Sequence, residues 1–228
     1  MNRSQRRQQE RAKKKAVKGG QGLFNVHAEV ITPWADVLLK VKLPTKVLQG
    51  MLEITDQVLQ DPDRKNWGDN LAGQIQDEPL IPHQLMQDYK FTDHKGNEGN
   101  IFLFFMNIIG EYVSHCHKQM ATSSEFDKIK DETYMTQMKS CWVISQWEGE
   151  YNPIHVHTEC QMSTVMYLKI PEFLPGVKPD RDDGGCIMFI GGAGGGSRLT
   201  RNLLKVQPKV GDFFIFPAHL QHTVYPFR

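Results

Sequence analysis

The sequence predicts a mainly β protein of the α+β class, with helices in the N-terminal half and a β-sandwich or jelly-roll core in the C-terminal half. Apolar residues recur at helical spacing in segments 44–60 and 100–120. From Ser140 onward, short aromatic and β-branched segments alternate with turn signals. Helices followed by many short strands are typical of helices packed on an antiparallel sandwich.

The first 22 residues form a basic arm, which we expect to be disordered because it lacks hydrophobic periodicity. Residues 1–18 carry eight Lys or Arg and one Glu, so the rest of the chain is mildly acidic although the net charge is +1. At most a weak contact of this arm with nucleic acid or another acidic partner is expected. Residues 23–228 are predicted to form a single domain, with helical support over 23–139 and the core over 140–228.

The composition also bears on the compartment. The longest apolar run, Ile101–Met106, is too short to span a bilayer, and no segment resembles the apolar part of a signal peptide. The four cysteines are widely spaced without a C-x-x-C pair, which indicates neither a disulfide framework nor a zinc finger. We therefore expect a cytoplasmic protein without a membrane segment.

The N-terminal elements follow from local patterns. Residues 24–31 alternate loosely and predict a first strand. Segment 44–60 predicts a helix that begins at Pro44-Thr45 and stops at Asp61-Pro62. Residues 66–81, rich in Gly, Asp and Pro, predict a loop with a short helix, and 100–120 predict a second long helix.

The C-terminal half predicts a series of short strands separated by Gly and Pro. Their expected ranges are 141–147, 155–159, 163–170, 185–190, 203–206, 212–216 and 223–227. The glycine-rich segment 191–196 lacks the Lys-Ser/Thr ending of a phosphate-binding loop. We therefore expect that segment to be a connecting loop.

Two stretches of the C-terminal half carry the residues suited to chemistry. GEYNPIHVHTEC, residues 149–160, places His155, His157 and Glu159 two residues apart. On a strand, such residues point to one face of the sheet. VGDFFIFPAHLQHTVYPF, residues 210–227, contains a buried-type strand followed by His222.

A small open-sided barrel would bring the side chains of these two stretches to one point. Two ligands from one strand and one from another form a facial set of three, which leaves the opposite side of a metal ion free. Imidazole and carboxylate ligands with open positions favour Fe(II), while zinc, manganese and nickel remain compatible with the ligands alone.

The combined pattern resembles the Fe(II)/2-oxoglutarate-dependent oxygenases of the prolyl-hydroxylase-like group, in a phage and marine-bacterial branch. The resemblance extends over residues 140–227 and implies a double-stranded β-helix (jelly-roll, cupin-like) core that uses Fe(II), 2-oxoglutarate and O₂. It implies a hydroxylase acting on a peptidyl residue, proline among them, or on a small metabolite. The residues that carry it are Asn152-Pro153-Ile154-His155-Val156-His157, Ser163–Leu168, Gly211–Pro217 with His222, and Tyr225-Pro226-Phe227.

The resemblance leaves two sets of iron ligands open. The wider superfamily uses His-x-Asp/Glu with a distal histidine, which corresponds to His157, Glu159 and His222. The branch resembled here shares a His-x-His pair, which corresponds to His155, His157 and His222. Three neutral imidazoles would make the site more cationic and would favour the binding of anionic 2-oxoglutarate.

The cosubstrate requires further residues. The far carboxylate of 2-oxoglutarate needs a cation, which the family usually places on the strand after the distal histidine. Here the chain ends at Arg228, so either Arg228 serves or a further C-terminal segment is missing from this sequence. Tyr167, on the same strand face as Val165, is expected to hydrogen-bond the cosubstrate.

Two other functions stay open at this stage. The first is a cupin-type metalloenzyme that uses His155, His157 and His222 without 2-oxoglutarate. The second is a non-catalytic β-sandwich module that binds a sugar or a protein surface. The sequence identifies neither the substrate nor the oligomeric state, and it shows no aromatic and basic platform for nucleic acid.

Overall fold

The computed structural model describes residues 36–92, 96–120, 135–174, 183–191 and 202–228. The basic arm, the strand predicted at 24–31 and most of segment 191–196 lie outside these residues. The helices are α2 (Thr45–Gln60), the 3₁₀ helix η1 (Gly68–Asn70), α3 (His83–Asp88) and α4 (Ile101–Met120). The strands are β1 (Leu39–Lys42), β2 (Lys90–Thr92), β3 (Glu98–Asn100), β4 (Asn152–His155), β5 (Met162–Met166), β6 (Ile187–Ile190), β7 (Leu203–Val206), β8 (Asp212–Pro217) and β9 (Gln221–Val224).

Two antiparallel sheets form the β part of the protein. One has the strand order β1-β8-β5 and the other the order β4-β9-β6-β7, while β2 and β3 form a separate pair. Within the described part of the chain, no ladder joins the two larger sheets. The predicted class, mainly β with N-terminal helices, is confirmed, and its core consists of two open sheets rather than a closed barrel.

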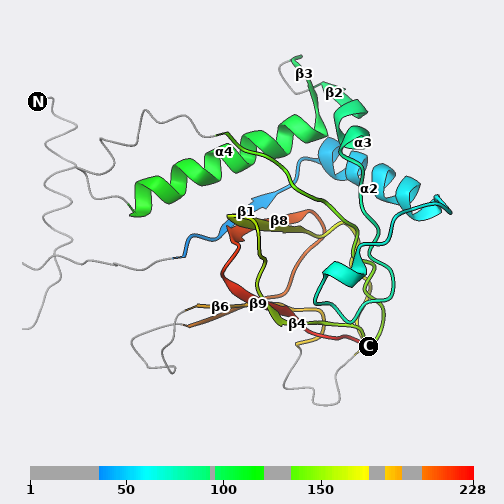
Figure 1. Ribbon diagram of the computed structural model, residues 1–228, viewed down its shortest axis with the longest axis vertical. Coiled ribbons are helices and arrows are strands. Elements are labelled where there is room, and N and C mark those ends of the chain that lie inside the picture. Colours follow the sequence, from blue (N-terminus) through cyan, green and yellow to red (C-terminus); the bar gives the residue numbers. More distant parts are fainter. Residues whose placement is uncertain (1–35, 93–95, 121–134, 175–182, 192–201) are drawn as a thin grey trace, which may run out of the picture. The chain divides into compact units, whose positions relative to one another are not determined.

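Strand β8 lies between the helices and the second sheet, which explains why it is apolar on both faces. Phe213 and Ile215 pack in one cluster with α2 and α4, whereas Phe214 and Phe216 pack in another with β6. Successive side chains of a strand point to opposite faces, so a strand covered on both faces is continuously apolar. Figure 1 shows α2 and α4 on one side of β1 and β8, and β6, β9 and β4 on the other.

The two long helices form where their periodicity predicts. In α2 the buried residues Val47, Met51, Ile54 and Val58 share one face, and each contributes about 1.5–3 kcal/mol by burial. Asp61 ends this helix in an extended conformation, ψ 116, because a residue before proline is driven out of the helical region.

Strand β5 ends at Met166, before the predicted end at 170, and β9 spans 221–224 instead of 223–227, while two further predicted strands differ more. Segment 141–147 forms no regular strand. The N–H of Val143 instead donates to the carbonyl oxygen of Pro79, and the carbonyl oxygen of Cys141 accepts from the N–H of Ile81, in the loop before α3. The strand predicted at 155–159 ends at His155, and Glu159 adopts φ 59. That left-handed conformation turns the chain and breaks the alternation of side chains. None of the described helices combines the length and the apolar character needed to cross a lipid bilayer.

Candidate metal centre

Strands β4 and β9 bring His155 and His222 directly opposite each other. The two residues are partners in the antiparallel ladder, and their ring centroids lie 4.2 Å apart. The register of β4 shifts between Asn152 and His155, where Pro153 lacks a donor for the ladder. Because β4 is an edge strand, the sheet accommodates this proline without losing a central hydrogen bond.

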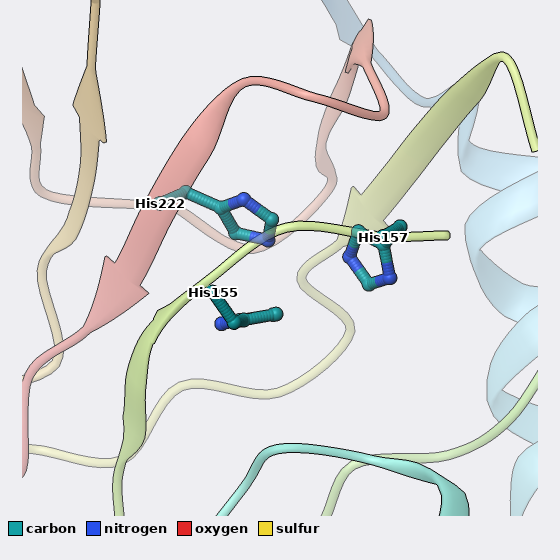
Figure 2. A group of neighbouring side chains, drawn as sticks. All are labelled: His155, His157 and His222. Atoms are coloured by element: carbon teal, nitrogen blue, oxygen red, sulfur yellow. The ribbon is translucent and has the colours of Figure 1, made fainter.

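His157 reaches the same point from the segment that follows β4. Its backbone N–H donates to the carbonyl oxygen of Ala218, in the turn between β8 and β9, at 2.9 Å. Its ring centroid lies 5.1 Å from that of His222 and 5.2 Å from that of His155. One ligand nitrogen of each of the three rings lies within 4.8 Å of the others, and Figure 2 shows the rings gathered around one space.

Backbone carbonyls orient two of these rings. Nδ1 of His155 lies 2.7 Å from the oxygen of Pro153, and Nδ1 of His222 lies 2.9 Å from the oxygen of Leu220. A carbonyl oxygen only accepts, so each Nδ1 carries the proton and Nε2 keeps its lone pair. This is the tautomer that metal-binding histidines adopt when a neighbour fixes the ring.

Burial keeps two of the three histidines, His157 and His222, uncharged. His222 is 4% exposed and lies against the ring of Phe216, with a centroid distance of 4.7 Å. Burial, with a smaller contribution from His155, lowers the pKa of His157 to about 4. Burial likewise lowers the pKa of His222 to about 4, and the two neighbouring histidines add to this effect. Both rings are therefore neutral at pH 7, the form that binds a metal ion.

Glu159 and Arg228 do not belong to the group of three histidines whose ligand atoms converge. Glu159 is exposed beyond the turn and is not among the residues whose ligand atoms converge. The side chain of Arg228 is 60% exposed, and its Nε lies 3.8 Å from Glu148 Oε1. Glu159 lines the cleft around the histidines, whereas Arg228 does not. The role of Arg228 towards 2-oxoglutarate stays a prediction.

Tyr167 lies inside the protein, next to the second sheet. Its ring packs edge-on against Phe214, and burial raises the pKa of its hydroxyl. The hydroxyl oxygen has no hydrogen-bond partner among the described residues, although it is buried. A buried hydroxyl without a partner is costly, which makes it available to a ligand entering the cleft.

The three histidines open onto a cleft of about 2380 Å³. Tyr167 lines this cleft, together with Trp142 and Glu78, which local sequence patterns do not single out. The ring of Trp142 lies 6.1 Å from that of His157. Glu78, from the loop before α3, and Trp142, from the segment after α4, thus line the same cleft as the three histidines of the C-terminal half.

Glu78 should make the stability of the protein depend on pH. Its side chain is 1% exposed, and burial, with a smaller contribution from Glu150, raises its pKa from 4.5 to about 7. Between these values the folded protein binds more protons than the unfolded chain, so the free energy of unfolding falls as the pH rises. We expect the loss to reach up to ~3 kcal/mol by pH 8, and Glu78→Gln to remove it.

Urea denaturation of both proteins between pH 4.5 and pH 8 checks this expectation. Asp77→Asn is the matched control, because the Asp77 carboxylate is bound by Arg64 at 2.9 Å and is partly exposed. Parallel pH profiles for the wild type and Glu78→Gln would show that Glu78 ionises normally.

The donor set fits Fe(II). Three imidazole nitrogens from two sides of one space form a group that first-row divalent metals bind, with room for further ligands on the cleft side. The lowered pKa values mean that protons do not compete with the metal at neutral pH.

Comparisons with known proteins agree with this chemistry. Residues 140–228 match the family described as "Putative 2OG-Fe(II) oxygenase". The crystal structure of a Pseudomonas putida prolyl-4-hydroxylase is similar over 83% of this chain and 86% of that chain, at 13% identity and a TM-score of 0.46, a likeness too distant to carry a functional inference. No curated protein matches the chain. The segment that matches this family, residues 140–228, contains all three histidines of the cluster, and both findings support an oxygenase that uses Fe(II) and 2-oxoglutarate.

Proposed function

We propose that the enzyme hydroxylates a C–H bond of a peptidyl residue, proline being the first to test, or of a small metabolite. His155, His157 and His222 are the proposed iron ligands. The observation that supports this proposal is the convergence of three ligand nitrogens within 4.8 Å at the mouth of a large cleft. Such a cleft can admit both the cosubstrate and a side chain of the substrate.

The residues around the metal centre would have different roles. When bound, Fe(II) with 2-oxoglutarate and O₂ supplies the oxidation, in which 2-oxoglutarate is converted to succinate and CO₂. The three imidazoles hold the metal, and the carbonyls of Pro153 and Leu220 keep two of them in the required tautomer. Phe216 packs behind His222 and excludes water from that side of the cluster.

Tyr167 is the proposed hydrogen-bond donor to 2-oxoglutarate. Tyr167→Phe should weaken the binding of 2-oxoglutarate by about 5–10-fold, the value of one neutral hydrogen bond. The stability of the ligand-free protein should not fall, because the hydroxyl has no partner among the described residues. Calorimetric titration and thermal unfolding measure the two effects.

Tyr225→Phe is the matched control, because its hydroxyl contacts Met188 Sδ and it does not line the cleft. An unchanged affinity of Tyr167→Phe for 2-oxoglutarate would remove Tyr167 from the proposed cosubstrate site.

The choice between the two ligand sets is also testable. We expect His155→Ala to lose stoichiometric Fe(II) binding and Glu159→Ala to keep it, because only His155 shares the space of His157 and His222. Anaerobic equilibrium dialysis with Fe(II) measures the occupancy of each variant. Loss of iron in Glu159→Ala with retention in His155→Ala would instead support the set that contains a carboxylate.

The reaction itself is tested by the release of succinate. The enzyme is incubated with Fe(II), 2-oxoglutarate and O₂, with and without proline-containing peptides, and products are identified by mass spectrometry. The proposal expects a peptide or metabolite that gains 16 mass units in step with succinate, as one oxygen atom is inserted. Failure to form succinate despite full iron occupancy would contradict it, and would favour a cupin-type enzyme that does not use 2-oxoglutarate.

We infer a cytoplasmic location for the enzyme. None of the four cysteines forms a disulfide within the described part of the chain, as expected in a reducing compartment. A peptide or a small molecule is the proposed partner, and the basic arm is left with at most a weak contact to nucleic acid.

A further inference from the structure

A buried carboxylate without a partner lies in the same cleft as the histidines. Neither Oε1 nor Oε2 of Glu78 has a hydrogen-bond partner among the residues that the structure describes. The backbone of the residue is held on both sides: its N–H donates to Asn66 Oδ1 at 3.1 Å, and its carbonyl oxygen accepts from the N–H of Trp67 at 3.0 Å. The backbone of Glu78 is thus held in place, while the bonding capacity of its carboxylate is unused within the described part of the chain.

The backbone pairing places this side chain on the cleft side of its segment. Leu80 is bridged to Trp142, whose ring approaches His157, while Ile81 belongs to the helical core. In an extended segment alternate residues share a face, so Glu78 lies on the face of Leu80. Glu78, Leu80 and Ile81 all line the cleft.

Two glycines and one amide shape the space around the carboxylate. A β-carbon placed on Gly68 would lie 3.5 Å from Glu78 Oε2. A β-carbon placed on Gly73 would lie 3.4 Å from Glu78 Oε1 and 2.7 Å from Asn152 Oδ1. Glu78 Oε1 and Asn152 Oδ1 therefore both lie beside Gly73, and Asn152 lies on β4, three residues before His155.

The polar groups around Gly68 and Gly73 determine which kind of ligand could bind there. A buried carboxylate without a partner, lying near an amide side chain, favours a ligand group rich in N–H bonds. A divalent metal ion such as Ca²⁺ takes six to eight oxygen ligands, more than these side chains offer. A primary ammonium or a guanidinium at the end of a slender chain needs only two or three acceptors.

We propose that Glu78 and Asn152 bind a cationic group of the substrate, and that the enzyme prefers substrates carrying a lysine-like amine or an arginine-like guanidinium. This inference rests on the proposed function, because it places the substrate in the cleft of the metal centre. A bound cation favours the ionised form of Glu78, and charge-assisted hydrogen bonds to that form distinguish a cation from a neutral group of the same shape by about tenfold or more.

The test compares cationic probes with neutral ones. Nα-acetyl-lysine amide and Nα-acetyl-arginine amide are titrated by calorimetry into anaerobic enzyme loaded with Fe(II) and 2-oxoglutarate. Nα-acetyl-norleucine amide and Nα-acetyl-citrulline amide serve as the neutral counterparts. We expect at least one cationic probe to bind about tenfold more tightly than its counterpart, and this preference to vanish in Glu78→Gln.

Two more variants keep the test decisive. Asp77→Asn removes the neighbouring carboxylate, which Arg64 already binds, and should keep the preference. Gly73→Ala retains Glu78 but adds a methyl group to the shared space, and should abolish the preference even if Glu78→Gln does not fold.

The outcomes separate this inference from the proposed function. A visible charge-transfer band in the loaded enzyme shows that the metal centre forms; its absence would count against the proposed function. With the band present, equal affinity for cationic and neutral probes in the wild type would overturn the cation site. Binding of Ca²⁺ or Mg²⁺ that requires Glu78 would also overturn it, because the carboxylate would then hold a metal ion.

Discussion

His222→Ala is expected to abolish stoichiometric Fe(II) binding and to lower the turnover of 2-oxoglutarate by more than about 100-fold. Loss of a residue that merely orients a metal ligand commonly costs 10–100-fold in affinity or activity, so loss of a ligand should cost more. His222 is the most buried of the three histidines and the one that joins β9 to the site. Its removal leaves two imidazoles, which cannot form a facial set of three.

His219→Ala is the matched control, because His219 lies three residues before His222. His219 occupies the turn before β9, is 76% exposed, and has its Nε2 3.1 Å from Asp36 Oδ1. His219→Ala should bind iron and turn over 2-oxoglutarate like the wild type. Anaerobic dialysis measures iron, circular dichroism confirms the fold, and wild-type iron occupancy in folded His222→Ala would rule out His222 as a ligand.

Phe216→Ala should destabilise the protein by about 3–5 kcal/mol, the usual cost of removing a buried aromatic ring. Phe216 is fully buried on β8, and its ring lies 5.1 Å from that of Phe189 and 4.7 Å from that of His222. The cavity would therefore open between the two sheets and beside a metal ligand. We expect weaker iron binding in addition to the loss of stability.

Urea denaturation of the metal-free protein measures the loss, and Leu203→Ala provides the control. Leu203 lies on the edge strand β7 and is 52% exposed, so its replacement should change stability by no more than ~0.5 kcal/mol. Similar denaturation midpoints for the wild type and Phe216→Ala would show that the sheets are not held together by this ring.

The sequence predicts best the elements in which apolar residues recur with a strong local period. Helices α2 and α4 begin and end within a residue of their expected bounds, since each has an apolar stripe and a clear start or stop. Strand β7 coincides with its predicted range. Strand β1 escapes prediction because its Leu-Lys-Val-Lys pattern is short, and its place depends on pairing with β8, more than 160 residues away.

In the candidate site, too, some residues are predicted by local sequence patterns and others depend on the folded structure. The spacing of His155, His157 and His222 is visible in the sequence, and the structure brings these three residues together. Glu159 shares the same spacing, but whether it points with them depends on where β4 ends and on the positive φ at its own position. Glu78 has no local signal, because the absence of a partner is a property of the folded cleft.

Anomalous diffraction from crystals loaded with Fe(II) under anaerobic conditions tests the central claim most directly. We expect a single iron peak at about 2.2 Å from one nitrogen of each of His155, His157 and His222, close to the usual metal–imidazole distance. An iron bound elsewhere, or bound by Glu159 with His155 turned away, would contradict the three-histidine centre.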